Sequence, residues 1–230
     1  MALPHLHLVS FPLCPFVQRS VITLKHKKVP FELTYIDIKS PPAWFLEKSP
    51  TGKVPLLLVD GATPVFESAV ISEYVDEISP PRLLPEDPLK RALARAWIAF
   101  ASEMIMAMHR WMTAATETAF REARDEAAKG LRRMDTQCVA APCFSGPDFS
   151  LLDATLAPVL MRYDLLRDAD SPWQPEHYPQ LARWWTHMAS LPEVKESVRE
   201  DFQERLTGFL NAQEGFAGPR LAAGLAARGH

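Results

Sequence analysis

The chain has 230 residues, a hydrophobic fraction of 47%, a charged fraction of 23% and a formal net charge of −3. These values are typical of a globular protein and exclude a disordered or collagen-like chain. Because the charge is slightly negative and no apolar run approaches the ~20 residues of a membrane span, we expect neither a nucleic-acid partner nor a membrane partner.

The cysteine content and the first residues bear on the cellular compartment. Three cysteines are too few, and odd in number, for a disulfide framework, so we expect free thiols. The first residues lack the basic region and the long apolar region of a secretory signal. Both observations predict a cytoplasmic protein.

The first third of the chain alternates predicted strands with predicted helices. Apolar alternation predicts the strands, and a period near 3.6 residues predicts the helices. Asp60-Gly61 is typical of a hairpin turn between two strands. The strands are expected at residues 5–11, 31–38, 56–59 and 64–67, and the helices after Cys14, at 43–48 and at 69–78, the last one capped by Ser68. This order predicts an α/β domain with a thioredoxin-like fold over residues 1–79.

The remainder of the chain is predicted to be helical. Residues 80–90 are rich in proline and are predicted to form a linker, and residues 91–214 are predicted to form an all-α domain. Residues 215–230 are rich in Ala, Gly and Arg without a clear amphipathic face. We therefore predict a mobile tail there.

Several helix boundaries can be read from capping residues. Ser150 and Asp153 have the spacing of a capping box, so a helix should begin between them. Pro179 and Pro192 suit the first turn of two later helices. Longer helical segments are expected at 89–119 and 120–139.

Cys14 stands between a predicted strand and a predicted helix, and Pro15 can occupy the first helical position. The cysteine is thereby placed at the N-cap, where free main-chain N–H groups and the helix dipole stabilise a thiolate. Arg19 adds positive charge if it faces the same way. We therefore interpret Cys14 as reactive, with a lowered pKa, rather than as a buried structural cysteine. Position 17 is a valine, so an external thiol has to resolve any mixed disulfide.

Two further segments can bind a peptide-like ligand. A cis bond at Pro55 would turn the N–H and C=O of Val54 outward, where a peptide can pair with them. Only about 5–6% of X-Pro bonds are cis, so the residues alone favour a trans bond. Ser68 and the N–H groups of a helix start can hold a carboxylate, and Glu67 can accept from an ammonium group. This arrangement suits an α-amino acid head, and a plain N-cap is the alternative.

Taken together, these motifs resemble those of a known family. The runs S-F-P-L-C-P-F-V-Q-R around Cys14, G-K-V-P ending at Pro55 and F-E-S-A-V-I-S-E-Y around Ser68 are similar to those of the cysteine-type cytosolic glutathione transferases. The nearest classes are the omega class and its bacterial relatives. The run S-L-L-D-A-T-L-A-P is similar to the capping-box helix of this family. The resemblance implies the glutathione transferase fold, glutathione as cosubstrate, a homodimer, and a pocket for the acceptor substrate in the all-α domain.

The resemblance also implies a role for each matching residue. Cys14 is the catalytic cysteine and forms a mixed disulfide with glutathione. Val54 makes antiparallel main-chain hydrogen bonds to the cysteinyl part of glutathione, with Pro55 in the cis form. Glu67 and Ser68 hold the γ-glutamyl head.

The contact to the glycyl carboxylate departs from the family pattern. Omega-class proteins commonly place a lysine near the loop before the short helix, and the corresponding position here is Pro41. Lys39 and Lys53 are the candidates for this contact.

Other chemistry-bearing residues have simpler interpretations. His5 and His7 face one side of a strand, but the sequence places no third ligand, so we expect no metal site. A stripe on the first long helix is interpreted as core packing, and the wall of an apolar pocket above Cys14 is the alternative that the family suggests. This stripe consists of Met104, Met108, Trp111 and Met112. Cys138 and Cys143 lack the spacing of a metal site and are expected to be free thiols.

The predicted function is glutathione-dependent thiol transfer on an oxidised thiol or a dehydroascorbate-like dicarbonyl. Cys14 attacks the substrate and becomes glutathionylated, and a second glutathione regenerates it. One alternative is conjugation of glutathione to a small electrophile, or cleavage of an ether or halide, with the thiolate of glutathione as the nucleophile. Another is a non-enzymatic interaction protein with the same fold.

Overall fold

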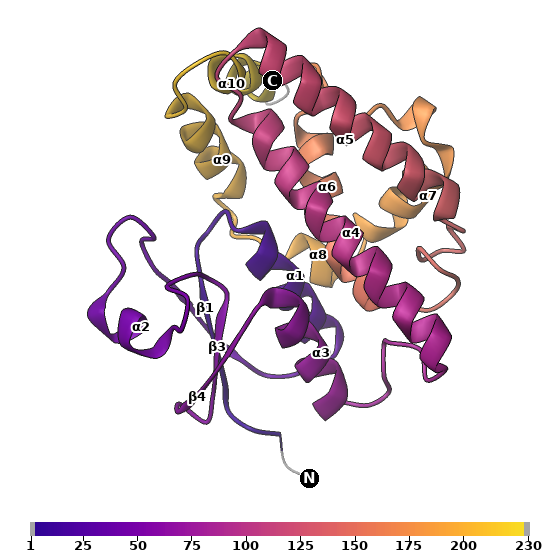
Figure 1. Ribbon diagram of the computed structural model, residues 1–230. Helices are drawn as coiled ribbons and strands as arrows, with labels where there is room; N and C mark the ends of the chain where they lie inside the picture. The colour runs from indigo at the N-terminus through magenta and orange to yellow at the C-terminus, as the bar shows by residue number, and fades with distance from the viewer. Residues whose placement is uncertain (1–2, 228–230) are drawn as a thin grey trace.

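The computed structural model describes residues 3–227 as a four-stranded sheet domain followed by a helical domain (Figure 1). The predicted fold, a thioredoxin-like α/β domain followed by an all-α domain, is confirmed. The elements of the first domain are β1 (Leu6–Ser10), α1 (Pro15–His26), β2 (Glu32–Tyr35), α2 (Ala43–Lys48), β3 (Leu56–Val59), β4 (Thr63–Phe66) and α3 (Ser68–Ile78).

The sheet has helices on both faces. Its strand order is β2-β1-β3-β4, with β1 parallel to β2 and antiparallel to β3, and β3 antiparallel to β4. Successive side chains of a strand point to opposite faces. Leu6 and Leu8 pack in one core with residues of α1 and α3, whereas Val9 packs with Phe45 of α2. Figure 1 shows α1 and α3 on the side of the helical domain and α2 on the far side.

The helical domain is arranged around one central helix, α6, in which almost every residue is buried. Both α4 and α6 pack against the first domain through α1. Within residues 3–227, no helix is both long and apolar enough to cross a membrane. The helices are α4 (Pro88–Met112), α5 (Glu117–Gln137), α6 (Leu151–Leu165), α7 (Pro179–Met188), α8 (Pro192–Lys195), α9 (Phe202–Asn211) and α10 (Ala217–Ala227), with a 3₁₀ turn η1 (Pro175–His177).

Two predicted helix boundaries are wrong. The first long helix ends at Met112, because Thr116 starts a new one: its side chain accepts from the N–H of Ala119 at 3.2 Å. The helix predicted from Pro192 ends at Lys195, and α9 follows after a break.

The predicted mobile tail over residues 215–230 also differs from the structure. Residues up to 227 include the packed helix α10, in which Leu221 is completely buried. A Cβ atom on Gly224 would lie 2.3 Å from the Cβ of Ala169, so small residues allow this helix to approach its neighbours closely. Because this helix packs through Ala and Gly, its sequence lacks the periodic pattern of large apolar residues that predicts a packed helix. Residues 228–230 of the predicted tail lie outside the described residues.

Asp76 fixes the segment between the domains. Its side chain is 1% exposed and accepts hydrogen bonds from the N–H groups of Leu83 at 2.6 Å and Leu84 at 3.1 Å. Lys27, the residue that follows α1, forms an ion pair with it at 3.1 Å. This buried carboxylate therefore ties the start of the linker to α1 and α3.

Asp153 has the corresponding role inside the helical domain. The capping box predicted for Ser150 and Asp153 is present. The buried carboxylate also accepts from the N–H of Phe144 at 2.8 Å and from the indole N–H of Trp184 at 2.7 Å. One side chain thus joins the start of α6 to the preceding loop and to α7.

We expect Asp153→Ala to lower the free energy of unfolding by about 3 kcal/mol, because it leaves the buried donors of Phe144 and Trp184 without acceptors. Urea denaturation followed by circular dichroism measures the change. Asp125→Ala, at an exposed position of α5, is the matched control and should change stability by less than about 0.5 kcal/mol. Equal stability of the two variants would contradict this role of Asp153.

Candidate active site

Cys14 caps the start of α1, as the sequence predicts. Its φ and ψ angles are −72° and 113°, and Pro15 is the first helical residue. The N–H of Cys14 donates to the carbonyl of Phe11 at 3.0 Å, which closes the turn between β1 and α1. The side chain is only partly buried, unlike those of Cys138 and Cys143. The turn therefore presents a single accessible thiol at a helix start.

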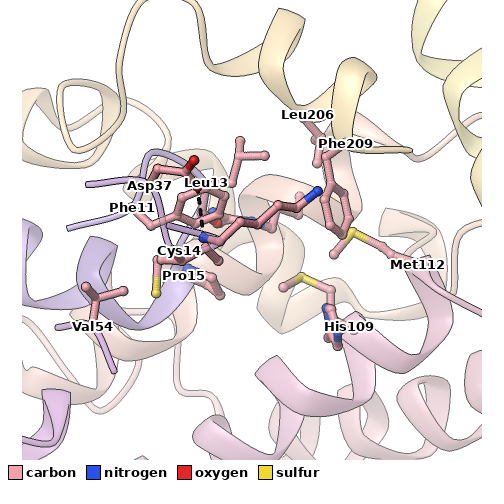
Figure 2. A pocket seen from close by; sticks show the side chains of 14 residues that line it. Phe11, Leu13, Cys14, Pro15, Asp37, Val54, His109, Met112, Leu206 and Phe209 are labelled. Carbon is pink, nitrogen blue, oxygen red and sulfur yellow. Dashed lines mark hydrogen bonds between the residues drawn. The ribbon is translucent and has the colours of Figure 1, made fainter. Parts of the chain in front are cut away.

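A mostly apolar cavity of about 330 Å³ lies over Cys14. Figure 2 shows the sulfur on the side of the cavity where Val54 lies, with Met112 and Phe209 on the other side. The helical domain contributes Met108, His109, Met112, Arg162, Leu206 and Phe209 to its wall. The cavity is therefore built by both domains.

The surroundings of Cys14 shift its pKa in opposite directions. Burial raises the pKa of the thiol and is the largest effect. The main-chain N–H groups of Val17 and Phe16 lower the pKa by less, and so do the charges of Arg162 and Arg19. The lowered pKa expected from the sequence is therefore wrong for this structure. The sequence shows where the helix starts, but it does not show that the fold removes water from the sulfur.

Arg162 of α6 is a functional candidate that the sequence reasoning missed. The residue is 2% exposed and donates to the carbonyl of Leu13 at 3.0 Å and to the side chain of Gln18 at 2.6 Å. No carboxylate in the described part of the chain pairs with its guanidinium, and burial lowers its pKa to about 10. The sequence offered one indication of this role, because Arg162 is the only basic residue in the mostly apolar segment that forms α6. Arg162 therefore holds both sides of the Cys14 turn and brings a positive charge to it.

The bond between Val54 and Pro55 is cis. This agrees with the family resemblance and overturns the trans bond that the residues alone favour. Val54 borders the same cavity as Cys14. The structure thus places the predicted peptide-binding segment at Val54 and Pro55 beside the cavity that contains the Cys14 thiol.

Glu67 and Ser68 lie at the start of α3, with one change from the prediction. Glu67 is the N-cap, with φ at 67°, and Ser68 is the first helical residue rather than the cap. The Ser68 hydroxyl is buried and accepts from Arg19 Nε at 2.8 Å. These two residues do not line the cavity over Cys14. Arg19 connects the start of α3 with the cysteine, because it donates to Ser68 and its charge acts on Cys14.

The structure separates the two lysine candidates. Lys39 borders the cavity, and its N–H donates to the carboxylate of Asp37 at 2.9 Å. Lys53 is exposed and is not part of the cavity wall. Of the two, only Lys39 is placed beside the cavity.

The two N-terminal histidines bind other side chains. His5 lies 3.1 Å from the carboxylate of Glu32, and His7 lies 2.9 Å from the hydroxyl of Thr34. Among residues 3–227, no group of three or more His, Cys, Asp and Glu side chains is arranged to hold a metal ion.

The methionine stripe of α4 has both predicted roles. Met104 and Trp111 are buried in the core, whereas Met108 and Met112 also border the cavity. Cys138 and Cys143 are free thiols in the core of the helical domain, and burial raises the pKa of each to about 12. Neither is placed to take part in chemistry at the cavity.

The comparisons with known proteins agree with this fold. The family model for the glutathione S-transferase N-terminal domain matches residues 13–78, and that for the C-terminal domain matches residues 117–185. The chain is 33% identical over 196 residues to pyrimidodiazepine synthase of Drosophila melanogaster, covering 82% of this chain and 79% of that protein. It is 28% identical over 188 residues to glutathione S-transferase omega-1 of Sus scrofa, covering 80% and 77% of the two chains.

A solved structure extends the similarity to three dimensions. A rice glutathione transferase in complex with glutathione superposes with a TM-score of 0.78 at 25% identity, covering 91% of this chain and 96% of that one. The class of protein is thus one with a thioredoxin-like domain, a helical domain, and a cavity between the two domains that contains a cysteine. The chain belongs to the glutathione transferase family.

We expect the rate at which iodoacetamide alkylates Cys14 to rise with pH, with its midpoint above that of free cysteine (~8.5), because burial raises the pKa of this thiol. Mass spectrometry of the peptide that contains Cys14 measures the rate. Arg162→Gln should move the midpoint further up, since it removes a positive charge that lowers the pKa.

Free cysteine measured in parallel is the reference for this experiment. Cys138 and Cys143 are internal controls, because a pKa of about 12 keeps them protonated over the range studied. A midpoint below that of free cysteine would show that the helix start outweighs burial.

Proposed function

We propose that this protein is a glutathione-dependent thiol transferase and that Cys14 forms the mixed disulfide. Glutathione is the cosubstrate, which the family membership and the glutathione-bound relative support. The observation that carries the proposal is the position of Cys14: its thiol lies at a helix start on the wall of the cavity, whereas Cys138 and Cys143 are buried in the helical core.

The reaction consists of two thiol–disulfide exchanges. The Cys14 thiolate attacks the glutathione sulfur of a mixed disulfide, a bond between Cys14 and glutathione forms, and the substrate leaves as a thiolate that takes a proton from water. The thiolate of a second glutathione then attacks this bond, which gives oxidised glutathione and regenerates the Cys14 thiolate. Val17 stands where a second cysteine of a C-x-x-C pair would be, so the second step uses external glutathione. A reducing compartment such as the cytoplasm supplies it.

Each part of glutathione has a proposed position. The cysteinyl part pairs with the main chain of Val54 and so brings its sulfur to Cys14. The γ-glutamyl head lies at Glu67 and Ser68, where helix N–H groups are free. Lys39 holds the glycyl carboxylate, because it borders the cavity and Lys53 does not. The apolar wall around Met112 then receives the substrate, an oxidised thiol or a small electrophile.

The raised pKa of Cys14 favours a second candidate function. A cysteine that stays protonated can donate its S–H to the thiolate of glutathione. Glutathione would then be the nucleophile, and the reaction would be conjugation to an electrophile or cleavage of an ether or halide. In this case Cys14 positions glutathione without forming a bond to it.

We expect Cys14→Ser to lower the rate of thiol transfer with a glutathione mixed disulfide at least ~10³-fold, because the nucleophile is lost. In parallel, oxidised glutathione should add one glutathionyl group to the wild-type protein at Cys14, and reduced glutathione should release it. Intact-protein and peptide mass spectrometry measure both steps.

Cys143→Ala is the control, because it removes a thiol that does not border the cavity, and it should be glutathionylated as the wild type is. Full thiol transfer by Cys14→Ser would remove Cys14 from the mechanism. Conjugating activity that is kept or gained in Cys14→Ser, with no adduct on the wild type, would establish the second candidate function.

We also propose that the protein is a homodimer, as the resemblance implies. Several large apolar side chains stay exposed on β4, α3 and the first half of α4. Their exposed fractions are 38% for Phe66, 53% for Val70, 69% for Leu89 and 55% for Leu93. Exposed apolar side chains on neighbouring elements are typical of an interface between subunits.

Val70→Glu combined with Leu93→Glu should therefore convert a dimer to a monomer, because the interface would have to bury two charges on each subunit. Light scattering coupled to size-exclusion chromatography measures the mass. Val139→Glu, at a position that is 57% exposed after α5, is the control and should leave the dimer intact. A monomeric wild-type protein would refute the proposal.

A further inference from the structure

Gln18 of α1 carries a buried amide whose two ends bind different parts of the helical domain. The residue is 3% exposed, and its Nε2 donates to the hydroxyl of Ser197 at 2.9 Å and to the sulfur of Met161 at 3.2 Å. Its Oε1 accepts from Nη1 of Arg162 at 2.6 Å. Gln18 lies one helical turn beyond Cys14, and its main-chain N–H donates to the carbonyl of that cysteine at 3.1 Å. The amide therefore connects the helix that begins at Cys14 to the second domain.

Ser197 determines which end of the amide faces Arg162. The Ser197 hydroxyl donates to the carbonyl of Val194 at 2.6 Å, so its one hydrogen is used and its oxygen accepts from Gln18. Only the NH₂ end of an amide can donate, so the carbonyl oxygen of Gln18 faces Arg162. The amide cannot flip without losing the bonds at both ends. Gln18 thus offers Arg162 a neutral acceptor in a fixed orientation.

The guanidinium of Arg162 has neutral acceptors in the described part of the chain. Besides Gln18, these acceptors are the carbonyl of Leu13 at 3.0 Å and the carbonyl of Pro158 at 2.8 Å. Arg162 is 2% exposed, so little water surrounds its charge. Cys14, Gln18 and Arg162 border one small void of about 10 Å³. A positive charge without an anionic partner is therefore buried beside the cysteine.

The charges around Cys14 influence its protonation. The titratable and charged side chains that border the spaces beside it, or that act on its pKa, lie on α1, α4 and α6, on β2 and just after β2; they are Arg19, Tyr35, Asp37, Lys39, His109 and Arg162. The charges of Arg162 and Arg19 lower the pKa of the thiol, against the larger effect of burial. A change in the charge of the group that binds Arg162 should therefore change the protonation of Cys14.

A glutamate at position 18 would have almost the same shape as Gln18 and a different charge. At the 2.6 Å that separates Oε1 from Nη1, a carboxylate would form a buried ion pair with Arg162 and cancel its charge. Because buried charges interact over short distances much more strongly than exposed ones, Cys14 would lose most of the stabilisation that Arg162 gives to its thiolate. The neutral amide avoids this loss.

We propose that Gln18 is a positioning residue for the Cys14 thiolate: as the neutral, buried partner of Arg162, it leaves one uncompensated positive charge beside the sulfur. This inference rests on the proposed function, because it takes the Cys14 thiolate as the reacting group. Gln18 acts through Arg162, since its own amide is hydrogen-bonded at both ends.

A purely structural role of Gln18 makes a different prediction. The residue joins α1 to α6 and to the segment before α9, so replacements that break these bonds lower the stability of the protein. If this were its whole role, charged and uncharged replacements would change Cys14 equally. The proposed role predicts a large effect from a charged replacement alone, because the carbonyls of Leu13 and Pro158 still hold Arg162.

The experiment measures the rate at which iodoacetamide alkylates Cys14 as a function of pH, by mass spectrometry of its peptide, in the full-length wild type and three variants. Gln18→Glu introduces the negative charge. Gln18→Met has a side chain of similar length, without the charge and without the hydrogen bonds. Gln203→Glu is the matched control, because it adds the same charge at an exposed position of α9.

Gln18→Glu should raise the midpoint of this pH profile by at least ~1 pH unit, which leaves ~10-fold less thiolate at neutral pH. Thiol transfer at pH 7 should fall only ~3-fold, because a thiolate of higher pKa is a better nucleophile. Gln18→Met should lower the stability to urea and shift the midpoint by less than ~0.3 pH units. Gln203→Glu should also shift it by less than ~0.3 pH units, since solvent and salt screen an exposed charge.

Cys138 and Cys143 report on folding in the same samples, because both thiols are buried. An unchanged midpoint in Gln18→Glu, or equal shifts in Gln18→Glu and Gln18→Met, would overturn the role of Gln18 and leave the proposed function intact. Unfolding of Gln18→Glu, seen as alkylation of the two buried thiols, would overturn it as well, because a carboxylate paired with Arg162 should be accommodated. A wild-type protein that oxidised glutathione does not modify at Cys14 would overturn the proposed function and this inference together.

Discussion

The contact between Arg162 and the turn that carries Cys14 is the interaction on which the rest of the site depends. Arg162 belongs to the central helix of the second domain, yet its hydrogen bonds go to Leu13 and Gln18, on either side of the cysteine. The same docking that positions the thiol also removes part of the water around it. The reactivity of Cys14 is consequently decided by a balance between desolvation, which favours the thiol, and nearby N–H groups and cations, which favour the thiolate.

Two buried guanidinium groups, on Arg19 and Arg162, make this balance unusual. Both have neutral hydrogen-bond partners within the described residues, and both are close enough to Cys14 for its charge to raise their pKa values. Buried cations without carboxylate partners are costly to fold around, so such positions are typical of sites where a ligand or intermediate brings the negative charge. In the proposed reaction the Cys14 thiolate is such an anion, and its charge acts on both arginines.

The same architecture supports both candidate reactions. A thiol exchange needs the thiolate of Cys14, whereas a conjugation needs the thiolate of glutathione, and the same N–H groups and cations can stabilise either sulfur. Of the side chains that α4 and α9 contribute to the cavity wall, His109 is the polar one, and the charged side chains that border the cavity are Asp37, Lys39 and Arg162. The protonation state of the Cys14 sulfur therefore distinguishes thiol exchange from conjugation, two reactions that use the same fold and the same cosubstrate.

The sequence by itself determined the features that depend on neighbouring residues. These include the helix start at Cys14 and Pro15, the hairpin at Asp60-Gly61, the capping box at Ser150 and the absence of a second cysteine at Val17, because caps, turns and spacing act over a few residues. The cis bond at Pro55 was suggested by the resemblance and not by the residues alone. Only the tertiary structure decided the rest. The pKa of Cys14 follows from burial beneath another domain, Arg162 and Arg19 gain importance from partners distant in sequence, and α10 packs through small residues that leave no periodic pattern. Desolvation and long-range contacts are properties of the folded chain, and no local pattern encodes them.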